Sequence, residues 1–394
     1  MTHERRKICV VTATRAEYGL LHSLLHLLSD DPGVSLQLVV TGTHLSPAHG
    51  STVTTIEKDG FEIAERISML LQDDSALGVT KSLGLAVLGF AEAFARLRPD
   101  LLVLLGDRYE VLGAAQAAMV ARIPIAHLHG GEATEGLIDE AIRHAVTKMS
   151  HLHFVAADVF RQRVIQLGES PTRVWTVGAT GLDNIAQLPL LDRAALEADL
   201  GITLASPSAL VTYHPVTLHD DDPAVAMRQL LAVLDRTVGS IILTGVNADT
   251  GSNAIRREAE HFAAARPGRV LLADSLGALR YLSAMKQVDL VIGNSSSGLL
   301  EAPALGTPTI DIGERQQGRP RAPSVIHSPN DPASIEAAIR HGLSVQHKAM
   351  SQRKETPYGT PGAAQRIAAV LKTHPLDRLL VKRFHDLGAG PAVT

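Results

Sequence analysis

The chain has 394 residues, and its 45% of hydrophobic and 20% of charged residues exclude wholesale disorder. A single hydrophobic core rarely grows past about 250–300 residues, so two domains are expected. A net charge of −4 without a long Lys/Arg block, and only 3% of aromatic residues, argue against nucleic acid or an anionic membrane as partners.

The N-terminal residues 1–7 are polar and lack the apolar core of a signal peptide. The single cysteine, Cys9, cannot form an internal disulfide and lies in an apolar run, where a small buried side chain is expected. The most apolar segment, 83–97, has its large side chains at helical spacing, and no apolar run approaches the ~20 residues that span a bilayer. We therefore expect a cytoplasmic location.

Short apolar runs alternate with helical patterns along the chain. Strands are expected over residues 7–12, 35–41, 101–105, 123–127, 152–156, 174–177, 209–213, 240–244, 270–272, 290–292 and 309–312. Helices are expected over 18–29, 83–97, 110–121, 138–149, 157–167, 193–200, 223–236, 253–265, 276–286, 331–342, 363–373 and 376–387. Several strands are apolar on both faces, which is typical of parallel strands covered by helices and predicts an α/β fold.

Glycine, proline and small residues between 178 and 207 mark the boundary between two α/β sets, 1–178 and 179–362. Ligands of such sheets bind at the carboxyl ends of the strands. The first strand ends in the loop 12–19, where the free backbone N–H groups and the dipole of a helix N-terminus favour an anion. The loop has neither three spaced glycines nor Gly-Lys-Ser/Thr, so an ordinary β–α turn is the alternative.

Asp107 and Arg108 follow the apolar strand 101–105. Arg108 is suited to grip a phosphate in fork geometry, and Asp107 to act as a general base or as the partner of the arginine. A structural ion pair at the helix start is the alternative.

The next strand leads into His127-Leu128-His129-Gly130-Gly131-Glu132, and Asp139 follows in the first turn of a helix. Strand alternation predicts that His127 and His129 point to the same side, and the glycines leave the backbone open to a ligand. Imidazoles and carboxylates with separated pKa values suit proton transfer. A metal site is the alternative, but the spacing matches no standard zinc motif.

Polar residues also end the strands of the second half. His214 follows one strand, Asn247 lies in the loop after the next, and Gly293-Asn294-Ser295-Ser296-Ser297-Gly298 precedes a helix. Ser295 and Ser296 are placed to cradle a diphosphate at that helix start. Glu301, one turn further, is suited to ribose hydroxyls.

These motifs together resemble the hydrolysing UDP-N-acetylglucosamine 2-epimerases of the sialic-acid pathway. The likeness covers residues 7–370 and is carried by the segments 105–110, 127–132, 138–144, 293–298 and 313–316. It implies a glycosyltransferase-B fold: two Rossmann-like domains facing a cleft, with the C-terminal helix (363–387) returning to the first domain. It implies no metal and no other cofactor, and assembly as a homodimer or homotetramer.

The resemblance implies that a base removes the C2 proton while the C1–O bond breaks, after which water adds to the glycal. The implied catalytic residues are Asp107, Glu132, Asp139, His129 and His214. The implied ligands of the UDP-sugar are Arg15, Arg108, Asn247, Ser295, Ser296, Glu301 and Arg315.

The chain departs from the family at one point, because some members carry a carboxylate where this chain has His129. Asp107, Asp139 and Glu132 are therefore preferred over His129 for proton transfer. The substrate is UDP-N-acetylglucosamine or its 2,4-diacetamido-6-deoxy analogue, and by resemblance the stretch 132–136 favours the analogue. The alternatives are a retaining glycosyltransferase of the same fold and a nonenzymatic nucleotide-sugar sensor.

Overall fold

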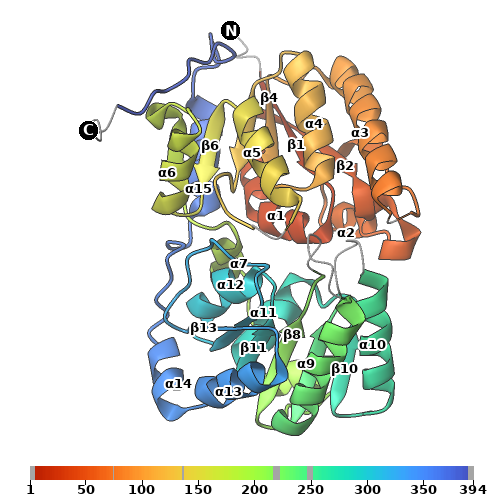
Figure 1. Ribbon diagram of the computed structural model, residues 1–394. Coiled ribbons are helices and arrows are strands. Elements are labelled where there is room, and N and C mark those ends of the chain that lie inside the picture. The colour runs from red at the N-terminus through yellow and green to blue at the C-terminus, as the bar shows by residue number, and fades with distance from the viewer. Residues whose placement is uncertain (1–4, 74, 135–136, 216–221, 246–251, 389–394) are drawn as a thin grey trace. The chain divides into compact units, whose positions relative to one another are not determined.

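The computed structural model describes residues 5–73, 75–134, 137–215, 222–245 and 252–388 (Figure 1). The chain divides into two compact units. The first comprises Met1–Glu132, Asp139–Asp183 and Gly359–Thr394, and the second Ala133–Ile138 and Asn184–Tyr358. The chain thus passes from the first unit to the second within α7 (Gly181–Gln187), shortly after the boundary at 178 that we predicted from composition.

The first unit is built on a parallel sheet with the strand order β3-β2-β1-β4-β5-β6-β7. The strands are β1 (Arg6–Thr12), β2 (Val34–Thr41), β3 (Ile63–Ile67), β4 (Leu101–Leu105), β5 (Ile125–Leu128), β6 (Leu152–Val155) and β7 (Val174–Thr176). The helical segments are α1 (Arg15–Ser29), η1 (Gly42–Leu45), η2 (Pro47–His49), α2 (Val53–Lys58), α3 (Ala76–Leu97), α4 (Tyr109–Val120), α5 (Asp139–Met149), α6 (Asp158–Gln166), η3 (Pro171–Arg173) and α15 (Ala363–Thr373).

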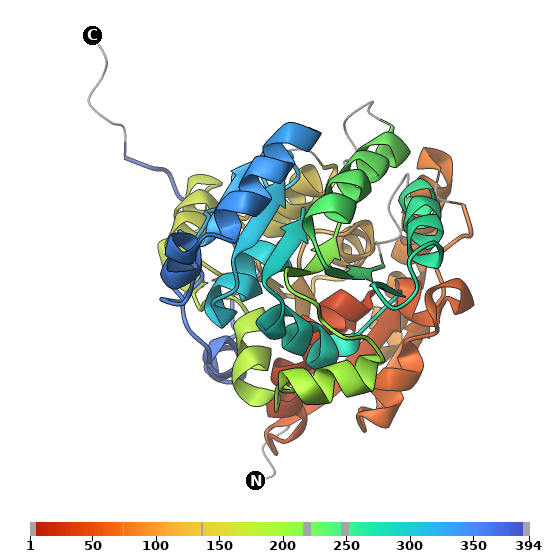
Figure 2. The ribbon, with the colours of Figure 1, turned by 90° about the horizontal axis from the view of Figure 1, so that it is seen from below.

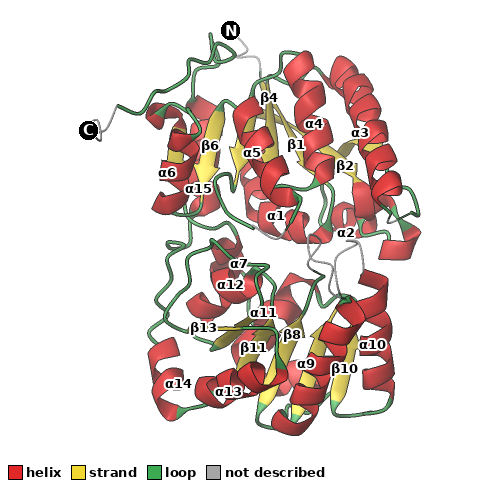
Figure 3. Ribbon diagram, viewed as in Figure 1, coloured by secondary structure: helices red, strands yellow, loops and turns green. Residues whose placement is uncertain are grey.

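Helices cover both faces of this sheet, as Figure 3 shows. Ile8 and Val10 of β1 belong to one buried cluster with α1 and α15, while Cys9 and Val11 belong to another with α3 and α4. This alternation follows from the two-residue period of a strand, and it explains why the buried residues 8–11 of β1 are all apolar. The chain order reverses between β1 and β4, where a doubly wound sheet opens a crevice for a ligand.

The second unit repeats the plan with a parallel sheet of order β10-β9-β8-β11-β12-β13. Its strands are β8 (Ser208–Thr212), β9 (Ser240–Thr244), β10 (Val270–Ala273), β11 (Leu290–Gly293), β12 (Thr309–Ile312) and β13 (Val325–Ser328). Its helices are α8 (Arg193–Leu200), α9 (Pro223–Thr237), α10 (Ser252–Ala264), α11 (Gly277–Gln287), α12 (Ser297–Leu305), α13 (Pro332–Gly342) and α14 (Val345–Ser351). Figure 2 shows α9 and α13 on one face and α8 and α11 on the other, and the order reverses between β8 and β11.

The last helix, α15, packs on the first unit. Its Ile367 and Leu371 join the core beside α1, and Lys372 forms an ion pair with Asp31 at 2.7 Å. The buried carboxylate of Asp183 accepts hydrogen bonds from the backbone N–H groups of residues 362–364 and so caps this helix. The chain is therefore fastened where it leaves the first unit and where it returns.

The prediction that this helix continues to residue 387 is wrong, because α15 ends at Thr373 and residues 376–387 form no helix. Pro375 disfavours a helical residue before it, and His374 is extended with φ −61° and ψ 129°. The segment that follows is held by polar contacts instead. Lys382 donates to the carbonyl oxygens of Lys148 and Ser150 and forms an ion pair with Glu169.

Helix α3 is the one helix in the described residues whose length and composition would suffice to cross a membrane. One face of it is part of the core of the first unit, where Phe90 and Phe94 are buried and Ala86 lies against Gly113 of α4. Core helices meet the same criterion, so α3 alone is weak evidence for a membrane span.

Candidate active site

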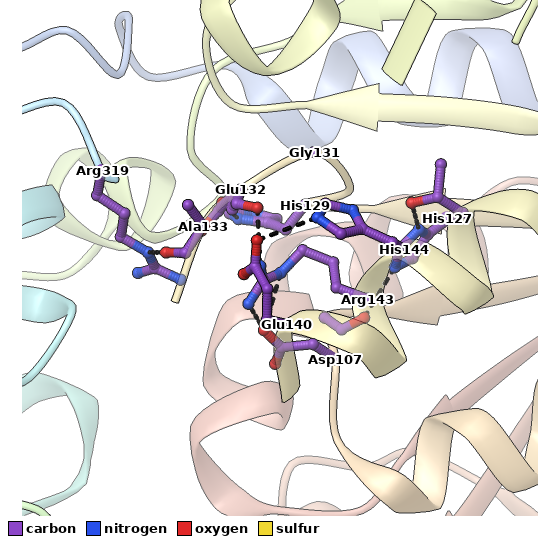
Figure 4. A network of polar contacts seen from close by, with 12 residues as sticks. Asp107, His127, His129, Gly131, Glu132, Ala133, Glu140, Arg143, His144 and Arg319 are labelled. Atoms are coloured by element: carbon purple, nitrogen blue, oxygen red, sulfur yellow. Dashed lines mark hydrogen bonds and ion pairs between the residues drawn. The ribbon is translucent and has the colours of Figure 1, made fainter. Parts of the chain in front are cut away.

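Arg143 of α5 organises the polar side chains at the carboxyl end of the first sheet (Figure 4). Its guanidinium donates to Asp107 Oδ2, with an Nε–Oδ2 distance of 2.9 Å, to Glu140 Oε2 at 2.5 Å and to the carbonyl oxygen of Glu132 at 2.7 Å. The arginine side chain is 1% exposed, whereas Asp107 and Glu140 are about a quarter exposed. The two carboxylates therefore face outward from a fixed buried cation.

The charge of Arg143 is secured by its neighbours. Burial lowers its pKa, but Asp107, Glu132 and Glu140 outweigh that effect and hold the pKa above its ordinary value. A buried arginine with such partners is a rigid positioning group. Neither Arg143 nor Glu140 was among the site residues predicted from the sequence, and the only signal was their place on the helix that begins at Asp139.

His129 and Glu132 form a second contact beside this network. His129 Nδ1 lies 2.7 Å from Glu132 Oε1, and its Nε2 lies 3.1 Å from Thr180 Oγ1. Both side chains are buried. The expectation that strand alternation places His129 on the side of His127 is wrong, because β5 ends at Leu128 and His129 adopts φ +63°. The turn directs its ring to Thr180, whereas the ring of His127 faces Thr147.

The glycines that follow His129 are required by packing inside the unit. A Cβ atom at Gly131, which has φ +74°, would lie 2.5 Å from the carbonyl oxygen of Phe160. The sharp turn is thus compatible only with glycine at this position.

His127 supports the loop that carries Asp107. Its Nε2 donates to the carbonyl oxygen of Gly106 at 2.8 Å, so Nδ1 is the acceptor for the Thr147 hydroxyl at 3.1 Å. Burial lowers the pKa of His127 to about 3. The imidazole is therefore neutral and structural, and it fixes the peptide that precedes Asp107.

This burial predicts an acid-sensitive fold. The unfolded chain binds a proton at His127 below about pH 6.5 and the folded chain only near pH 3, so stability is lost as the pH falls between these values. Between pH 7 and 5 the free energy of unfolding of the wild type should fall about 2 kcal/mol further than that of His127→Gln. Urea unfolding at the two pH values measures the difference. His261→Gln, at an exposed position of α10, is the control and should behave as the wild type; equal losses in the wild type and His127→Gln would refute the assignment.

Arg15 and Arg108 lie at the starts of two helices of the first unit. Arg15 is the first residue of α1 and is exposed, while Arg108 precedes α4 and lies 3.3 Å from the buried carboxylate of Glu110. These helices follow β1 and β4, the two strands between which the chain order reverses. Both arginines thus lie at the edge where an anion would meet helix N-termini.

Asn294 connects the strand ends of the second unit. Its side chain accepts from the backbone N–H of His214 at 2.7 Å and donates to the carbonyl oxygen of His214 at 2.8 Å. Its own carbonyl oxygen accepts from Arg315 Nη1 at 3.1 Å and from Gln316 Nε2 at 2.9 Å. Asn294 was quoted in a motif but not selected as a site residue, and it joins two loops that the sequence could not show as neighbours.

Three serines line the start of α12. Ser296 precedes the helix, and Ser295 Oγ lies 3.0 Å from Ser297 Oγ, which in turn lies 2.5 Å from the Tyr281 hydroxyl. Glu301, in the same helix, is buried. The hydroxyls and the N-terminal N–H groups of α12 therefore face the same strand ends as His214 and Arg315.

The predicted site residues thus fall in two groups. Asp107, Glu132, His129 and Asp139 belong to the first unit with Arg15 and Arg108, and the second unit contributes His214, Ser295, Ser296, Glu301 and Arg315. Asn247 and residues 135–136 lie outside the described residues. Over the described ranges, no three His, Cys, Asp or Glu side chains are arranged to hold a metal ion together.

Two parallel α/β units, each with polar strand ends at the reversal of strand order, place this chain in the glycosyltransferase-B fold class. The UDP-N-acetylglucosamine 2-epimerase from Neisseria meningitidis bound to UDP-GlcNAc matches with a TM-score of 0.79 at 16% identity, over 93% of this chain and 99% of that one. The Staphylococcus aureus MnaA–UDP structure matches with a TM-score of 0.78 at 16% identity, over 97% and 100%.

The chain belongs to the UDP-N-acetylglucosamine 2-epimerase family, whose model matches residues 26–372. It is 40% identical to the GDP/UDP-N,N'-diacetylbacillosamine 2-epimerase (hydrolyzing) of Campylobacter jejuni, over 97% of this chain and 100% of the relative. It is 34% identical to the UDP-N,N'-diacetylbacillosamine 2-epimerase (hydrolyzing) of Legionella pneumophila, over 96% and 98%. A polysialic acid biosynthesis protein of Escherichia coli is 36% identical over 93% and 94%. The family predicted from the motifs is confirmed.

Proposed function

We propose that this chain is a hydrolysing 2-epimerase that converts a nucleotide-activated 2-acetamido sugar and water into the free 2-epimeric sugar and the nucleoside diphosphate. The observation that carries the proposal is the network around Arg143. It presents Asp107 and Glu140 at the end of the first sheet, next to the His129–Glu132 contact. Proton removal and return at one carbon need two such groups, one on each face of the sugar.

The reaction proceeds in two steps. A base takes the proton from C2 as the C1–O bond breaks, and the electron pair of the C–H bond forms the C1–C2 double bond of a glycal while the nucleoside diphosphate leaves. Water then adds its oxygen to C1, and an acid returns a proton to the opposite face of C2. We assign these proton transfers to Asp107, Glu132, Asp139 and His129, with His214 assisting the leaving diphosphate.

Arg143 gives the carboxylates a defined geometry for this chemistry. Its planar guanidinium holds both Asp107 and Glu140. Both carboxylates are therefore already oriented, and little rotational freedom is lost when the sugar binds. The structure adds Glu140 to the candidates for proton transfer, because it is held by Arg143 and also lies 3.0 Å from His144 Nε2.

The polar residues at the other strand ends, which the proton transfers do not use, are assigned to the nucleotide. Ser295 and Ser296 at the start of α12 suit the diphosphate, because helix N-termini attract anions. We further assign Arg15, Arg108 and Arg315 to the diphosphate, and Glu301 and Asn247 to the nucleoside. Structural neighbours in complex with UDP or UDP-GlcNAc support a nucleotide-sugar as the ligand.

For the sugar we propose the 2,4-diacetamido-6-deoxy form, N,N'-diacetylbacillosamine, as in the names of relatives at 40% and 34% identity. The product would then enter nonulosonic acid synthesis. The relatives do not favour the retaining glycosyltransferase alternative. The cytoplasmic location and the homodimeric or homotetrameric assembly stay predictions.

The test is release of nucleoside diphosphate from purified protein without any acceptor. UDP-N,N'-diacetylbacillosamine, its GDP counterpart and UDP-N-acetylglucosamine are compared by kcat/KM. We expect the diacetamido UDP-sugar to be preferred by at least about fivefold, because a buried polar group left unpaired costs about 1–3 kcal/mol. Preference for UDP-N-acetylglucosamine would refute the sugar assignment. Release of the nucleoside diphosphate only with an added acceptor would instead support the retaining glycosyltransferase.

A further inference from the structure

A pair of buried carboxylates lies behind Arg108, at the point where β1 and β4 end. Glu110 of α4 is 0% exposed, and its Oε2 lies 3.3 Å from Arg108 Nε. Glu17 of α1 is 7% exposed and interacts electrostatically with both Glu110 and Arg108. The catalytic scheme above uses neither glutamate.

The capping of α1 accounts for only one of the two carboxylate oxygens of Glu17. Its Oε2 accepts from the backbone N–H groups of Ala13 at 2.8 Å and Thr14 at 3.3 Å, which completes the capping box of α1. Its Oε1 is buried and has no hydrogen-bond partner in the described part of the chain. A buried carboxylate oxygen without a partner is costly when ionised, so the geometry favours a protonated carboxyl there.

The charges around Glu17 also favour its protonated form. Burial and then Glu110 raise the pKa of Glu17 to about 8, against the smaller lowering effect of Arg108. From the neighbouring η1, His44 is bound to the hydroxyls of Thr12 and Thr52, and its burial lowers its pKa to about 4, so it adds no charge near neutral pH. Arg15, on the same helix as Glu17, is exposed. Arg108 is thus the cation shared by two buried carboxylates.

We propose that Glu17 and Glu110 form a carboxylate pair that positions Arg108 and takes up a proton when the nucleoside diphosphate binds to Arg108. This inference rests on the proposed function, which assigns Arg108 to the diphosphate. Above about pH 8, where Glu17 is ionised, binding of the phosphate to the guanidinium would leave two ionised carboxylates beside new negative charge in a poorly solvated place. A proton from solvent on the Glu17–Glu110 pair removes that repulsion, so diphosphate affinity depends on pH.

The experiment is calorimetric titration of the full chain with UDP at pH 8.5, in buffers of different ionisation enthalpy. The wild type should take up roughly two-thirds of a proton at this pH, since Glu17 is mostly ionised before binding and mostly protonated after it. Between pH 7.5 and 9.5 the Kd for UDP should rise about tenfold by the same linkage. Glu17→Gln should lose most of the uptake and most of the pH dependence, and it should fold, because glutamine also serves in a capping box.

Two further variants sharpen the test. Glu110→Gln should lose the proton uptake as well, since the remaining carboxylate then has Arg108 to itself, and it should bind UDP more weakly because Arg108 has lost its anchor. Glu57→Gln, an exposed carboxylate of the same unit, is the control and should match the wild type. Tight UDP binding without proton uptake, or full uptake in Glu17→Gln, would overturn this inference alone. Absence of binding to UDP and to GDP would instead count against the proposed function.

Discussion

Replacement of Asp107 by asparagine is expected to lower kcat by about two to four orders of magnitude, the usual contribution of a positioned acid or base. Asparagine keeps the size of the side chain, but its amide is not a base and makes a weaker contact with Arg143. Steady-state release of nucleoside diphosphate measures the loss. If substrate binding is retained, KM should change much less than kcat, because the interaction serves the proton transfer.

Asp100→Asn is the matched control for this variant. Asp100 immediately precedes β4, is exposed and accepts a hydrogen bond from the backbone N–H of Lys7 at 2.8 Å. Its replacement should leave kcat within about twofold, since an exposed hydrogen bond contributes little. A kcat of Asp107→Asn within about tenfold of the wild type, with the fold intact, would remove Asp107 from the proton transfers.

Gly293→Ala is expected to destabilise the second unit by about 2–5 kcal/mol, because the new methyl group has no space and a positive φ strains alanine. Gly293 ends β11 with φ +139°, and its Cβ would lie 1.9 Å from the carbonyl oxygen of Thr212. Strands β8 and β11 are paired at this position, so β11 would have to move away from β8 to remove the clash. The loss appears in urea unfolding followed by circular dichroism, and UDP binding should fall with it, because Asn294 and Ser295 follow directly.

Gly268→Ala separates the clash from the backbone strain. Gly268 also has a left-handed φ of +77°, but a Cβ there has no atom within 4 Å. It should cost about 1 kcal/mol, the strain of a left-handed conformation alone. Equal losses in the two variants would show that the contact with Thr212 is not what requires glycine at 293.

The elements of both units could be predicted where apolar runs and helical periods were strong, as in β4 and α4. The two strands that were missed, β3 and β13, lie at the edges of their sheets, and the centre of β3 carries two consecutive charged residues, Glu65 and Arg66. Edge strands are partly solvated and so lack the continuous apolar signal of buried ones. Residues 376–387 have apolar side chains at helical spacing, but Pro375 disfavours a continued helix and Lys382 holds the segment through Lys148, Ser150 and Glu169.

The site could be predicted at the level of strand ends but not of partners. The sequence indicated that Asp107 and the segment 127–132 meet at one edge, because they follow adjacent parallel strands. It could not indicate that Arg143 would be buried between Asp107 and Glu140, since helical spacing alone does not determine which face of α5 is turned toward Asp107. Likewise, the left-handed turn at His129 depends on the loop that follows β5, which strand alternation does not describe.

In the proposed reaction, water replaces the nucleotide through proton exchange at C2, and proton NMR in D₂O tests this most directly. The protein is incubated with UDP-N,N'-diacetylbacillosamine, and the sugar, the nucleotide and the C2 position are followed together. We predict UDP and a free sugar of inverted C2 configuration that carries solvent deuterium at C2. A free sugar that retains its original C2 proton and configuration would contradict the account.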